Sequence, residues 1–450
     1  MSKVINLKRG LNIRIKGEAE KALGPVVRTD KVALKPTDFP GLVPKILVKA
    51  DQQVKAGEAI FFDKYNPEIF FTAPTSGQVL AINRGERRKV LEIIIKADGK
   101  NESNAFNAAD PQKLSREDVK GQLIASGLWP FLKQRPYGTL AKPSQVPKHI
   151  FVSGFDSAPL APDYEFTLQG QASALQTGMN ALTKLTDGKV YVGISPMQSQ
   201  GIFAGLKNVE ISVFSGPHPA GNVGVQIHHT SPINKGEVVW TIDPQAVVFI
   251  GRLFQTGQVD MTKVIALAGS EVKDPKYYTT THCACLEKLV GGQTKMVENE
   301  RVISGNVLTG KQVDASQFLG FFDNQVTVIP EGDQYEFMGW ADPGFNKFTA
   351  SQTFFSKLFP KKEYTLDANL HGGERAFVMS GQYEKFLPMD ILPVYLLKAI
   401  LAGDIDKMEQ LGIYEVIEED LALCEFSCAS KIQVQSIVRQ GLNLMMKELG

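Results

Sequence analysis

The chain has 450 residues, of which 43% are hydrophobic, and 49 Lys and Arg residues offset 48 Asp and Glu residues to a formal net charge of +1. This length predicts roughly three or four domains, each able to bury its own core. The balanced charge excludes a global field that would attract nucleic acid, so we expect no nucleic-acid partner.

The sequence lacks the long apolar segments of exported and membrane-spanning proteins. Residues 1–17 alternate charged and apolar side chains instead of forming the continuous apolar region of a signal peptide. The longest apolar run, 391–402, contains Lys398 and is shorter than the roughly 18 residues that span a bilayer. We therefore expect no transmembrane segment, and membrane association only through partners. Four cysteines in a chain of this length are typical of a reducing cytoplasm.

Residues 1–40 are expected to form a strand-poor N-terminal segment, and residues 41–100 a small β-sandwich. The sandwich is predicted by four β-rich runs separated by turn residues, at 58–62, 69–72, 78–82 and 90–95. This pattern is typical of a biotinyl/lipoyl-like domain, and Lys64 lies near the hairpin where such domains carry their prosthetic group. Because Tyr65 follows in place of a small residue, we favour an unmodified surface lysine over a carrier arm.

Residues 101–300 alternate predicted strands and helices, which is typical of a Rossmann-like α/β domain. Ser115 is expected to cap a helix over 115–126, because acidic residues follow it in the first turn. A second helix is expected over 168–185. The predicted strands are 149–153, 189–194, 208–214, 238–242, 247–250 and 264–267.

The pattern changes after residue 301. Short strands and one short helix beginning near Asp314 predict a β-grasp, SLBB-like module over 301–375. Residues 376–450 are expected to form a C-terminal helical domain, because their apolar residues recur at helical spacing. Its predicted helices are 392–403, 404–411 and 421–447. The expected fold class is therefore an α/β multidomain protein.

Five long segments resemble the A subunit of the bacterial Na+-translocating NADH:quinone reductase (Nqr) family: 41–58, 216–229, 238–257, 371–393 and 418–431. The resemblance covers essentially the whole chain. It implies a six-subunit complex of the bacterial inner membrane that oxidises NADH, reduces ubiquinone or menaquinone to quinol, and exports Na+. The chain would be peripheral on the cytoplasmic face, bound to the five other subunits (B to F) and without a cofactor of its own.

The resemblance also implies where the cofactors lie. FMN, FAD, riboflavin and an iron–sulfur cluster are implied for other subunits, with quinone as the substrate. In the related Rnf C subunit and the flavin-carrying subunit of complex I, a glycine-rich loop holds FMN and NADH through close backbone N–H groups. The corresponding loop here, 127–133, contains Trp129, Pro130 and Phe131. Because these residues obstruct a ligand and Pro130 lacks an N–H, we predict that flavin and nucleotide binding are lost. The alternatives are a prosthetic-arm carrier and a flavin/NADH-binding electron-input subunit.

The four cysteines form two pairs that are weak metal candidates. Cys424 and Cys428 end a segment similar to a ferredoxin motif, but two thiolates alone cannot hold a four-iron cluster. Cys283 and Cys285 would have to complete such a site from a distance. We favour reduced thiols of a degenerate motif, and therefore no metal.

A glycine-rich turn at 216–224 follows a predicted strand, as a phosphate loop would. Pro217 and Pro219 remove N–H donors from it, so a tight structural loop is the better interpretation. The nearby histidines are expected to be surface or hydrogen-bonded side chains, with metal binding or a proton relay as the alternative. These histidines are His218, His228 and His229.

The aromatic and lysine-rich run 345–364, together with 371–375, is the candidate region for a quinone or a partner subunit. Aromatic side chains beside lysines suit a protein contact, a membrane surface or a quinone headgroup. His371 and Arg375 could donate to a quinone oxygen or to a partner carboxylate. The alternatives are a core-anchored loop with solvated lysines and a turn held by two glycines. The candidate residues are Phe348, Phe354, Phe355, Lys357, His371, Gly372, Gly373 and Arg375. No catalytic residue is predicted.

Overall fold

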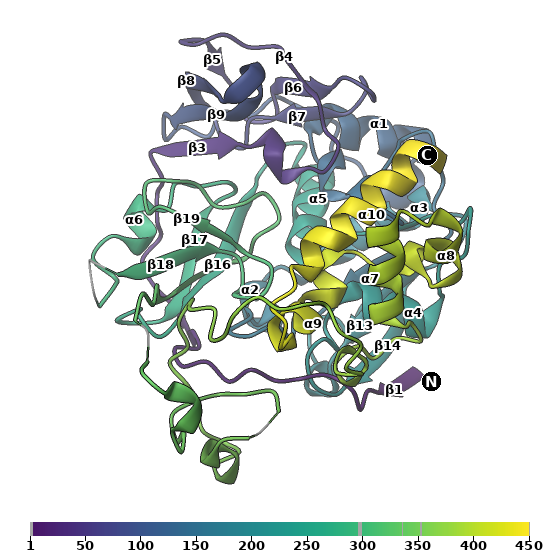
Figure 1. Ribbon diagram of the computed structural model, residues 1–450. Coiled ribbons are helices and arrows are strands. Elements are labelled where there is room, and N and C mark those ends of the chain that lie inside the picture. Colours follow the sequence, from purple (N-terminus) through teal and green to yellow (C-terminus); the bar gives the residue numbers. More distant parts are fainter. Residues whose placement is uncertain (1–2, 296–298, 335, 352, 450) are drawn as a thin grey trace.

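Within residues 3–295, 299–334, 336–351 and 353–449, which the computed structural model describes, the strands form four sheets. Two small sheets form an N-terminal sandwich, and two larger sheets lie below it (Figure 1). The C-terminal helices cover one side of the molecule, in yellow in Figure 1. Mixed sheets and helices confirm the predicted α/β multidomain class at this level.

The N-terminal sandwich is built from short antiparallel strands. Along β9 (Val90–Ala97), Ile93 and Ile95 are fully buried whereas Ile94 is partly buried and Lys96 is exposed, because side chains alternate between the faces of a sheet. The four predicted strands are observed as β6 to β9. The strands are β3 (Lys31–Leu34), β4 (Pro44–Ile46), β5 (Gln53–Val54), β6 (Ala59–Asp63), β7 (Phe70–Thr72), β8 (Gly77–Arg84) and β9 (Val90–Ala97).

The expectation of a strand-poor segment over 1–40 is wrong. Here β1 (Lys3–Asn6) pairs with β14 of the seven-stranded sheet, β2 (Glu20–Leu23) pairs with β17 of the six-stranded sheet, and β3 pairs with β9 of the sandwich. Most residues of β1 and β2 are exposed, so they lack the alternation that predicts a strand. The segments 3–6 and 20–23 form strands because each pairs with a strand that is distant in the sequence.

The seven-stranded sheet has the order β1-β14-β13-β12-β15-β10-β11. Its first five strands are parallel, and β10 and β11 extend it antiparallel. The strand β12 lies between β13 and β15. The chain passes from β12 to β13 on one side, and after β14 it returns to β15 on the other side of β12. Ligands of open α/β sheets bind at such a switch point. The strands are β10 (Lys133–Arg135), β11 (Thr139–Leu140), β12 (Ile150–Ser153), β13 (Val190–Ile194), β14 (Glu210–Ser215) and β15 (Val239–Thr241).

Two predicted helices of this region are confirmed in their main part. The first, α1 (Arg116–Ser126), begins at Ser115, whose side chain and that of Asp118 form a reciprocal capping box. The second is observed as α3 (Ala172–Leu185), with the short α2 (Tyr164–Thr167) just before it. A further helix, α4 (Val223–Thr230), follows β14.

The predicted strand at 247–250 is wrong, because these residues lie inside α5 (Pro244–Thr256). Asp243 accepts a hydrogen bond from the Gln245 backbone N–H, and Pro244 occupies the first helical position. Nearly every residue of α5 is buried. The residues 247–250 are all apolar, and so short an apolar run does not distinguish a helix from a buried strand.

The six-stranded sheet has the order β19-β18-β20-β16-β17-β2, and the expected domain boundary at residue 301 falls inside it. The short helix expected near Asp314 is wrong: Gln317 N–H donates to the Asp314 carbonyl and closes a single turn. The new elements are β16 (Thr262–Ala268), β17 (Lys276–Thr281), α6 (Glu287–Val290), β18 (Glu300–Ser304), β19 (Lys311–Val313) and β20 (Gln325–Pro330).

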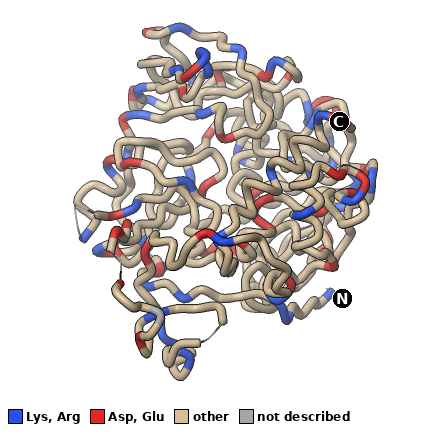
Figure 2. The backbone as a smooth tube through the Cα atoms, in the orientation of Figure 1, with Lys and Arg blue, Asp and Glu red and all other residues tan. Residues whose placement is uncertain are grey.

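After β20 the chain leaves the sheets in a long excursion, the green segment at the lower left of Figure 1. Apart from a single β-bridge between Tyr364 and Ile15, the described residues between 331 and 380 form short turns, 3-10 helices and irregular backbone. Charged residues of both signs are interspersed along all of these regions (Figure 2).

The single helix predicted over 421–447 is observed as two, α9 (Ala422–Ser427) and α10 (Val434–Leu449). A second helix starts because the Glu425 carboxylate accepts the backbone N–H of Gln435, near the first turn of α10. The other two helices, α7 (Pro393–Ala402) and α8 (Ile405–Gln410), are as predicted. Among the described residues, no helix is long and apolar enough to cross a membrane.

Candidate functional site

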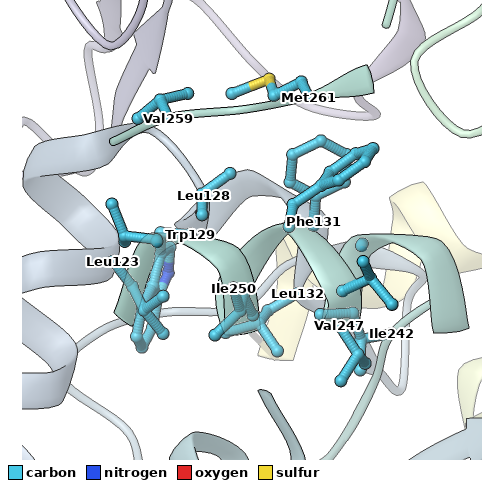
Figure 3. Packing of buried hydrophobic residues seen from close by; sticks show 14 of the residues in the cluster. Leu123, Leu128, Trp129, Phe131, Leu132, Ile242, Val247, Ile250, Val259 and Met261 are labelled. Carbon is cyan, nitrogen blue, oxygen red and sulfur yellow. The ribbon is translucent and has the colours of Figure 1, made fainter. Parts of the chain in front are cut away.

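The loop at 127–133 is part of the hydrophobic core (Figure 3). Trp129 is fully buried, donates from Nε1 to the Ala141 carbonyl over 2.8 Å, and packs edge-on against Trp240. Phe131 packs against Phe321, with 4.6 Å between ring centroids. These side chains are held from several directions, so the loop cannot open without breaking core contacts.

Most backbone donors of this loop are also occupied. Leu128 N–H donates to the Leu123 carbonyl over 3.0 Å, and Leu132 N–H donates to the Trp129 carbonyl over 2.9 Å. Phe131 N–H donates to the Leu128 carbonyl, and Pro130 has no N–H. A phosphate or flavin bound by this loop would need free N–H groups.

A cavity of about 200 Å³ lies next to the loop, beyond the carboxyl ends of β12 and β15. Its walls come from β10, from the residues that follow β12, β14 and β15, from the six-stranded sheet, and from the C-terminal segment near Glu419. Such a place, at a switch point and between regions, is where α/β proteins commonly bind small ligands.

Two lysines line this cavity. Lys133 Nζ lies 3.6 Å from the centroid of the Phe322 ring, and buried Lys263 donates to the Asp323 carbonyl over 2.8 Å. Burial lowers the pKa of both side chains, because the charged form loses its hydration. Neither lysine forms an ion pair with any residue in the described part of the chain.

The acidic side chains of the cavity wall have partners. Asp243 accepts hydrogen bonds from Tyr164 Oη at 2.8 Å and Asn324 Nδ2 at 2.7 Å. Glu419 forms an ion pair with Arg135 at 2.5 Å, and the same guanidinium reaches buried Asp420. The carboxylates are therefore held in place by neutral donors or by arginine.

Two further titratable groups on the wall have pKa values shifted toward their neutral forms. Burial raises the pKa of Asp156 to about 6, and burial lowers the pKa of His218 to about 4. The Asp156 carboxylate accepts the Ala158 backbone N–H over 2.8 Å, and His218 Nδ1 lies 3.0 Å from Ser157 Oγ.

Sequence reasoning missed this cavity. A signal was present for one residue, because Asp243 directly follows the predicted strand 238–242. Parallel strands bring their carboxyl ends to one edge of a sheet, where such polar residues meet. The contribution of Lys133 could not be found this way, because β10 was not predicted.

The predicted quinone or partner residues all lie on the excursion after β20, but their environments differ. Phe348 is half-buried and packs on Tyr364, with 5.6 Å between centroids. Phe354 is half-buried, whereas Phe355 and Lys357 are exposed. The structure therefore supports a core anchor for Phe348 and an exposed surface for the next part of the run.

The second part of that candidate region is fully on the surface. His371 is exposed, and its Nε2 lies 2.7 Å from Asp367 Oδ1. Gly372, Gly373 and Arg375 are also exposed, and the Arg375 backbone N–H donates to the Ser430 carbonyl over 3.1 Å. The side chain of Arg375 makes no ion pair with the described residues.

Large apolar side chains cluster in the exposed part of the excursion. We call this the aromatic surface and define it by six residues that are each more than half exposed: Phe337, Met338, Phe345, Phe355, Leu358 and Phe359. Lys357 and Lys361 lie exposed between or beside them. Exposed apolar residues that cluster in this way mark an interaction site, whereas isolated ones do not.

The two cysteine pairs lie in different places. Cys283 and Cys285 are buried near the sandwich and the six-stranded sheet, and burial raises the pKa of Cys283 to about 12. Cys424 and Cys428 are buried in the C-terminal core, where Tyr383 Oη donates to Cys428 Sγ over 2.9 Å. Among the described residues, no three His, Cys, Asp or Glu side chains are placed to hold a metal ion.

The remaining candidates have separate surroundings. Lys64 is exposed just after β6, and its backbone N–H donates to the Val43 carbonyl. His228 Nδ1 lies 2.8 Å from Glu415 Oε2, and His229 donates to the Pro388 carbonyl over 2.8 Å. The three histidines named from the sequence therefore each contact a different partner.

Three family models match successive parts of the chain. The NqrA N-terminal barrel-sandwich hybrid domain matches residues 5–98, the NqrA second alpha/beta domain matches 114–259, and the NQRA C-terminal domain matches 264–315. Together they cover the sandwich, the seven-stranded sheet and part of the six-stranded sheet.

Curated relatives match over the full length. The A subunit of the Na(+)-translocating NADH-quinone reductase of Rhodopirellula baltica is 39% identical over 453 residues, covering 99% of this chain and 98% of the relative. The same subunit of Yersinia pseudotuberculosis is 39% identical, covering 99% and 100%. Among solved structures, an NAD+-reducing [NiFe]-hydrogenase in the H2-reduced state covers 75% of this chain and 60% of its own, at 12% identity and a TM-score of 0.37, which is too low to carry an argument.

Proposed function

This chain belongs to the NqrA family, the A subunits of the Na+-translocating NADH-quinone reductases, and we propose that it acts in that complex as a peripheral, cofactor-free subunit. In this role it binds other subunits of the complex at the cytoplasmic face of the membrane. It contributes to assembly and to the reduction of quinone to quinol, while NADH oxidation and Na+ export take place in other subunits.

The loop at 127–133 supports the proposal that this subunit binds no cofactor. Its aromatic side chains pack in the core, and most of its N–H groups donate to carbonyls within the loop and α1. These residues do not fit a flavin or a nucleotide, because bulky side chains fill the space and most of the N–H donors that a phosphate would need are occupied or, at Pro130, absent. The flavins and the iron–sulfur cluster of such a complex therefore belong to other subunits.

The aromatic surface supports the assembly role. It exposes large apolar side chains with lysines beside them, in a chain whose described helices do not cross a membrane. The partner that suits it is a membrane-embedded subunit of the same complex, because apolar side chains would be buried there and lysines would lie near anionic headgroups. In this proposal, the exposed His371 and Arg375 form polar contacts at the rim of that interface, next to the place of quinone reduction.

The test is a triple variant of the aromatic surface, Phe355→Ser, Leu358→Ser and Phe359→Ser, in the assembled complex. We expect the variant chain to be lost when the complex is purified through a tag on a membrane subunit, and NADH-driven quinone reduction to fall with it. The matched control replaces three scattered residues of similar exposure, Val26, Val146 and Leu401, by Ser. A triple variant that co-purifies in full amount and sustains normal quinone reduction would contradict the proposal.

Two inexpensive measurements separate this function from its alternatives. An isolated chain without flavin absorbance supports the cofactor-free role, whereas a bound flavin would favour an electron-input subunit. An intact mass equal to that of the unmodified chain excludes a prosthetic arm on Lys64, whereas an added lipoyl or biotinyl group would establish one.

A further inference from the structure

We propose that the cavity between β10, β15 and β16 is a binding site for a small aromatic carboxylate, whose ring lies among phenylalanines and whose charge is held by Lys133 and Lys263. This inference goes beyond the proposed function, because it concerns an internal site that the assembly role does not use. It rests on the place of the cavity, its size, its rings and its charges.

The place of the cavity is the first argument. It opens beyond the ends of β12 and β15, where the connections of the parallel sheet change direction. The six-stranded sheet supplies Lys263 and the C-terminal segment supplies Ile417, so three regions of the chain meet around it. Sites between packed regions can be shaped by each of them, which favours a specific ligand.

The size of the cavity restricts the ligand. About 200 Å³ exceeds the roughly 150 Å³ that suffices to hold a benzene ring in an apolar protein cavity. Drug-sized ligands occupy roughly 300 Å³ or more. The cavity therefore suits a ligand with one ring and a small polar group.

The wall supplies ring contacts. Phenylalanine side chains from four segments reach it, and Tyr164 adds an aromatic face whose hydroxyl is already bound to Asp243. Aromatic rings stabilise an enclosed ring by edge and offset contacts. The phenylalanines are Phe131, Phe155, Phe249, Phe321 and Phe322.

The charges select an anion. The wall carboxylates of Asp243 and Glu419 are held by hydrogen bonds from Tyr164, Asn324 or Arg135, and neither forms a hydrogen bond or an ion pair with Lys133 or Lys263 in the described part of the chain. Among the described residues, the direct contacts of the two lysine head groups are a ring face and a carbonyl oxygen. A bound carboxylate would accept charge-assisted hydrogen bonds from them and would offset the desolvation that disfavours their charged forms.

The experiment uses the purified full-length chain and compares benzoate with benzamide, which has the same ring and a neutral head group. Saturation-transfer NMR or calorimetry measures each dissociation constant. We expect benzoate to bind at least about tenfold more tightly than benzamide, the size expected for a charge-assisted hydrogen bond. Equal affinities, or no binding of benzoate, would overturn the proposal.

Three variants locate the site. Lys133→Met and Lys263→Met are each expected to weaken benzoate binding about tenfold or more, with little effect on benzamide. Ala158→Leu fills the cavity and is expected to abolish binding of both. The matched control, Lys35→Met, removes a partly buried lysine that also donates to a carbonyl but lies outside the cavity wall.

Thermal unfolding of each variant verifies folding, and we expect the lysine variants to fold because each removes a buried charge. Unchanged benzoate affinity in both lysine variants, or in a folded Ala158→Leu chain, would overturn the site. An equal loss of benzoate affinity in Lys35→Met and in Lys133→Met would also overturn the site, because the loss would then not depend on a residue of the cavity wall.

Discussion

Aromatic side chains have opposite environments in the loop at 127–133 and on the aromatic surface. Trp129 and Phe131 are 0% and 5% exposed, whereas Phe337 and Phe355 are 95% and 52% exposed. The two segments look alike in composition, since each concentrates bulky apolar residues. The difference shows which aromatic groups stabilise the fold and which are free for a partner.

The two segments differ in how far other parts of the protein cover them. The loop lies between α1, α5 and the six-stranded sheet, so core residues cover it from several directions (Figure 3). The excursion is anchored at a few points, among them Tyr364, whose N–H donates to the Arg14 carbonyl over 2.9 Å. Beyond such anchors the described part of the excursion projects away from the sheets (Figure 1), and the six side chains of the aromatic surface are exposed.

The largest expected effect tests the buried side of this comparison. Trp129→Ala should lower the free energy of unfolding by roughly 3–5 kcal/mol, because it leaves a cavity next to Trp240 and removes the hydrogen bond to the Ala141 carbonyl. Urea unfolding followed by circular dichroism measures it. A loss below about 1 kcal/mol would mean that the loop is not part of the core.

A second prediction concerns charge in the buried region. The pKa of Asp156 is about 6 in the folded chain, above its ordinary value of 3.8, so the folded state binds the extra proton. The stability from this group is present below pH 3.8 and is lost as the pH rises through 6. Asp156→Asn should therefore be more stable than the native chain by up to about 3 kcal/mol at pH 8.

The advantage of Asp156→Asn should disappear as the pH falls from 6 to 4. His218 titrates with the opposite sign, but it is present in both chains and cancels from the difference. Urea unfolding of both chains at pH 4, 6 and 8 measures the effect. A difference that is constant with pH would show that the carboxyl group is not desolvated in the folded chain.

A third prediction concerns a buried polar ring in the same core. His282 is fully buried among Phe131, Phe249 and Phe321, neither ring nitrogen has a hydrogen-bond partner in the described chain, and burial lowers its pKa well below the ordinary value. His282→Phe should stabilise the fold by roughly 1–2 kcal/mol, because it removes unsatisfied polar atoms. Thermal unfolding at pH 7 tests this, and a destabilised variant would indicate that the ring nitrogens have a bound partner.

The smallest effect on stability is expected on the aromatic surface. Phe355→Ser, Leu358→Ser and Phe359→Ser together should change the free energy of unfolding of the isolated chain by no more than about 0.5 kcal/mol per site, since each side chain is more than half exposed. Urea unfolding of the same protein used for the assembly test measures this. A large loss of stability would mean that the surface is structural and would remove the contrast with the loop.

Local signals predicted the parts of the fold that depend on near neighbours. The capped start of α1 at Ser115 and the alternating strands β6 to β9 were found, because caps and alternation are readable within a few residues. The failures have different causes. The strands β1 and β2 are exposed edges of distant sheets and lack the local period that prediction needs, whereas the apolar run 247–250 inside α5 is too short to be told from a buried strand.

The candidate site was predicted in part. The obstructed loop was recognised from Trp129, Pro130 and Phe131, because their bulk is evident in the sequence. For the run 345–364, the sequence left open whether the aromatic side chains lie in the core or on the surface. In the structure, Phe348 is half-buried whereas Phe355 is exposed. The association of this region with quinone or a partner stays a prediction.

By itself, the sequence determined the family, the capped start of α1, the alternating strands of the sandwich and the bulk of the residues in the loop at 127–133. The tertiary structure alone decided the cavity, because Lys133, Asp243, Lys263 and Phe322 are far apart in the chain and meet only when two sheets pack together. It also decided which aromatic groups are exposed. Exposure depends on which distant segments cover a side chain, and no local pattern carries that information.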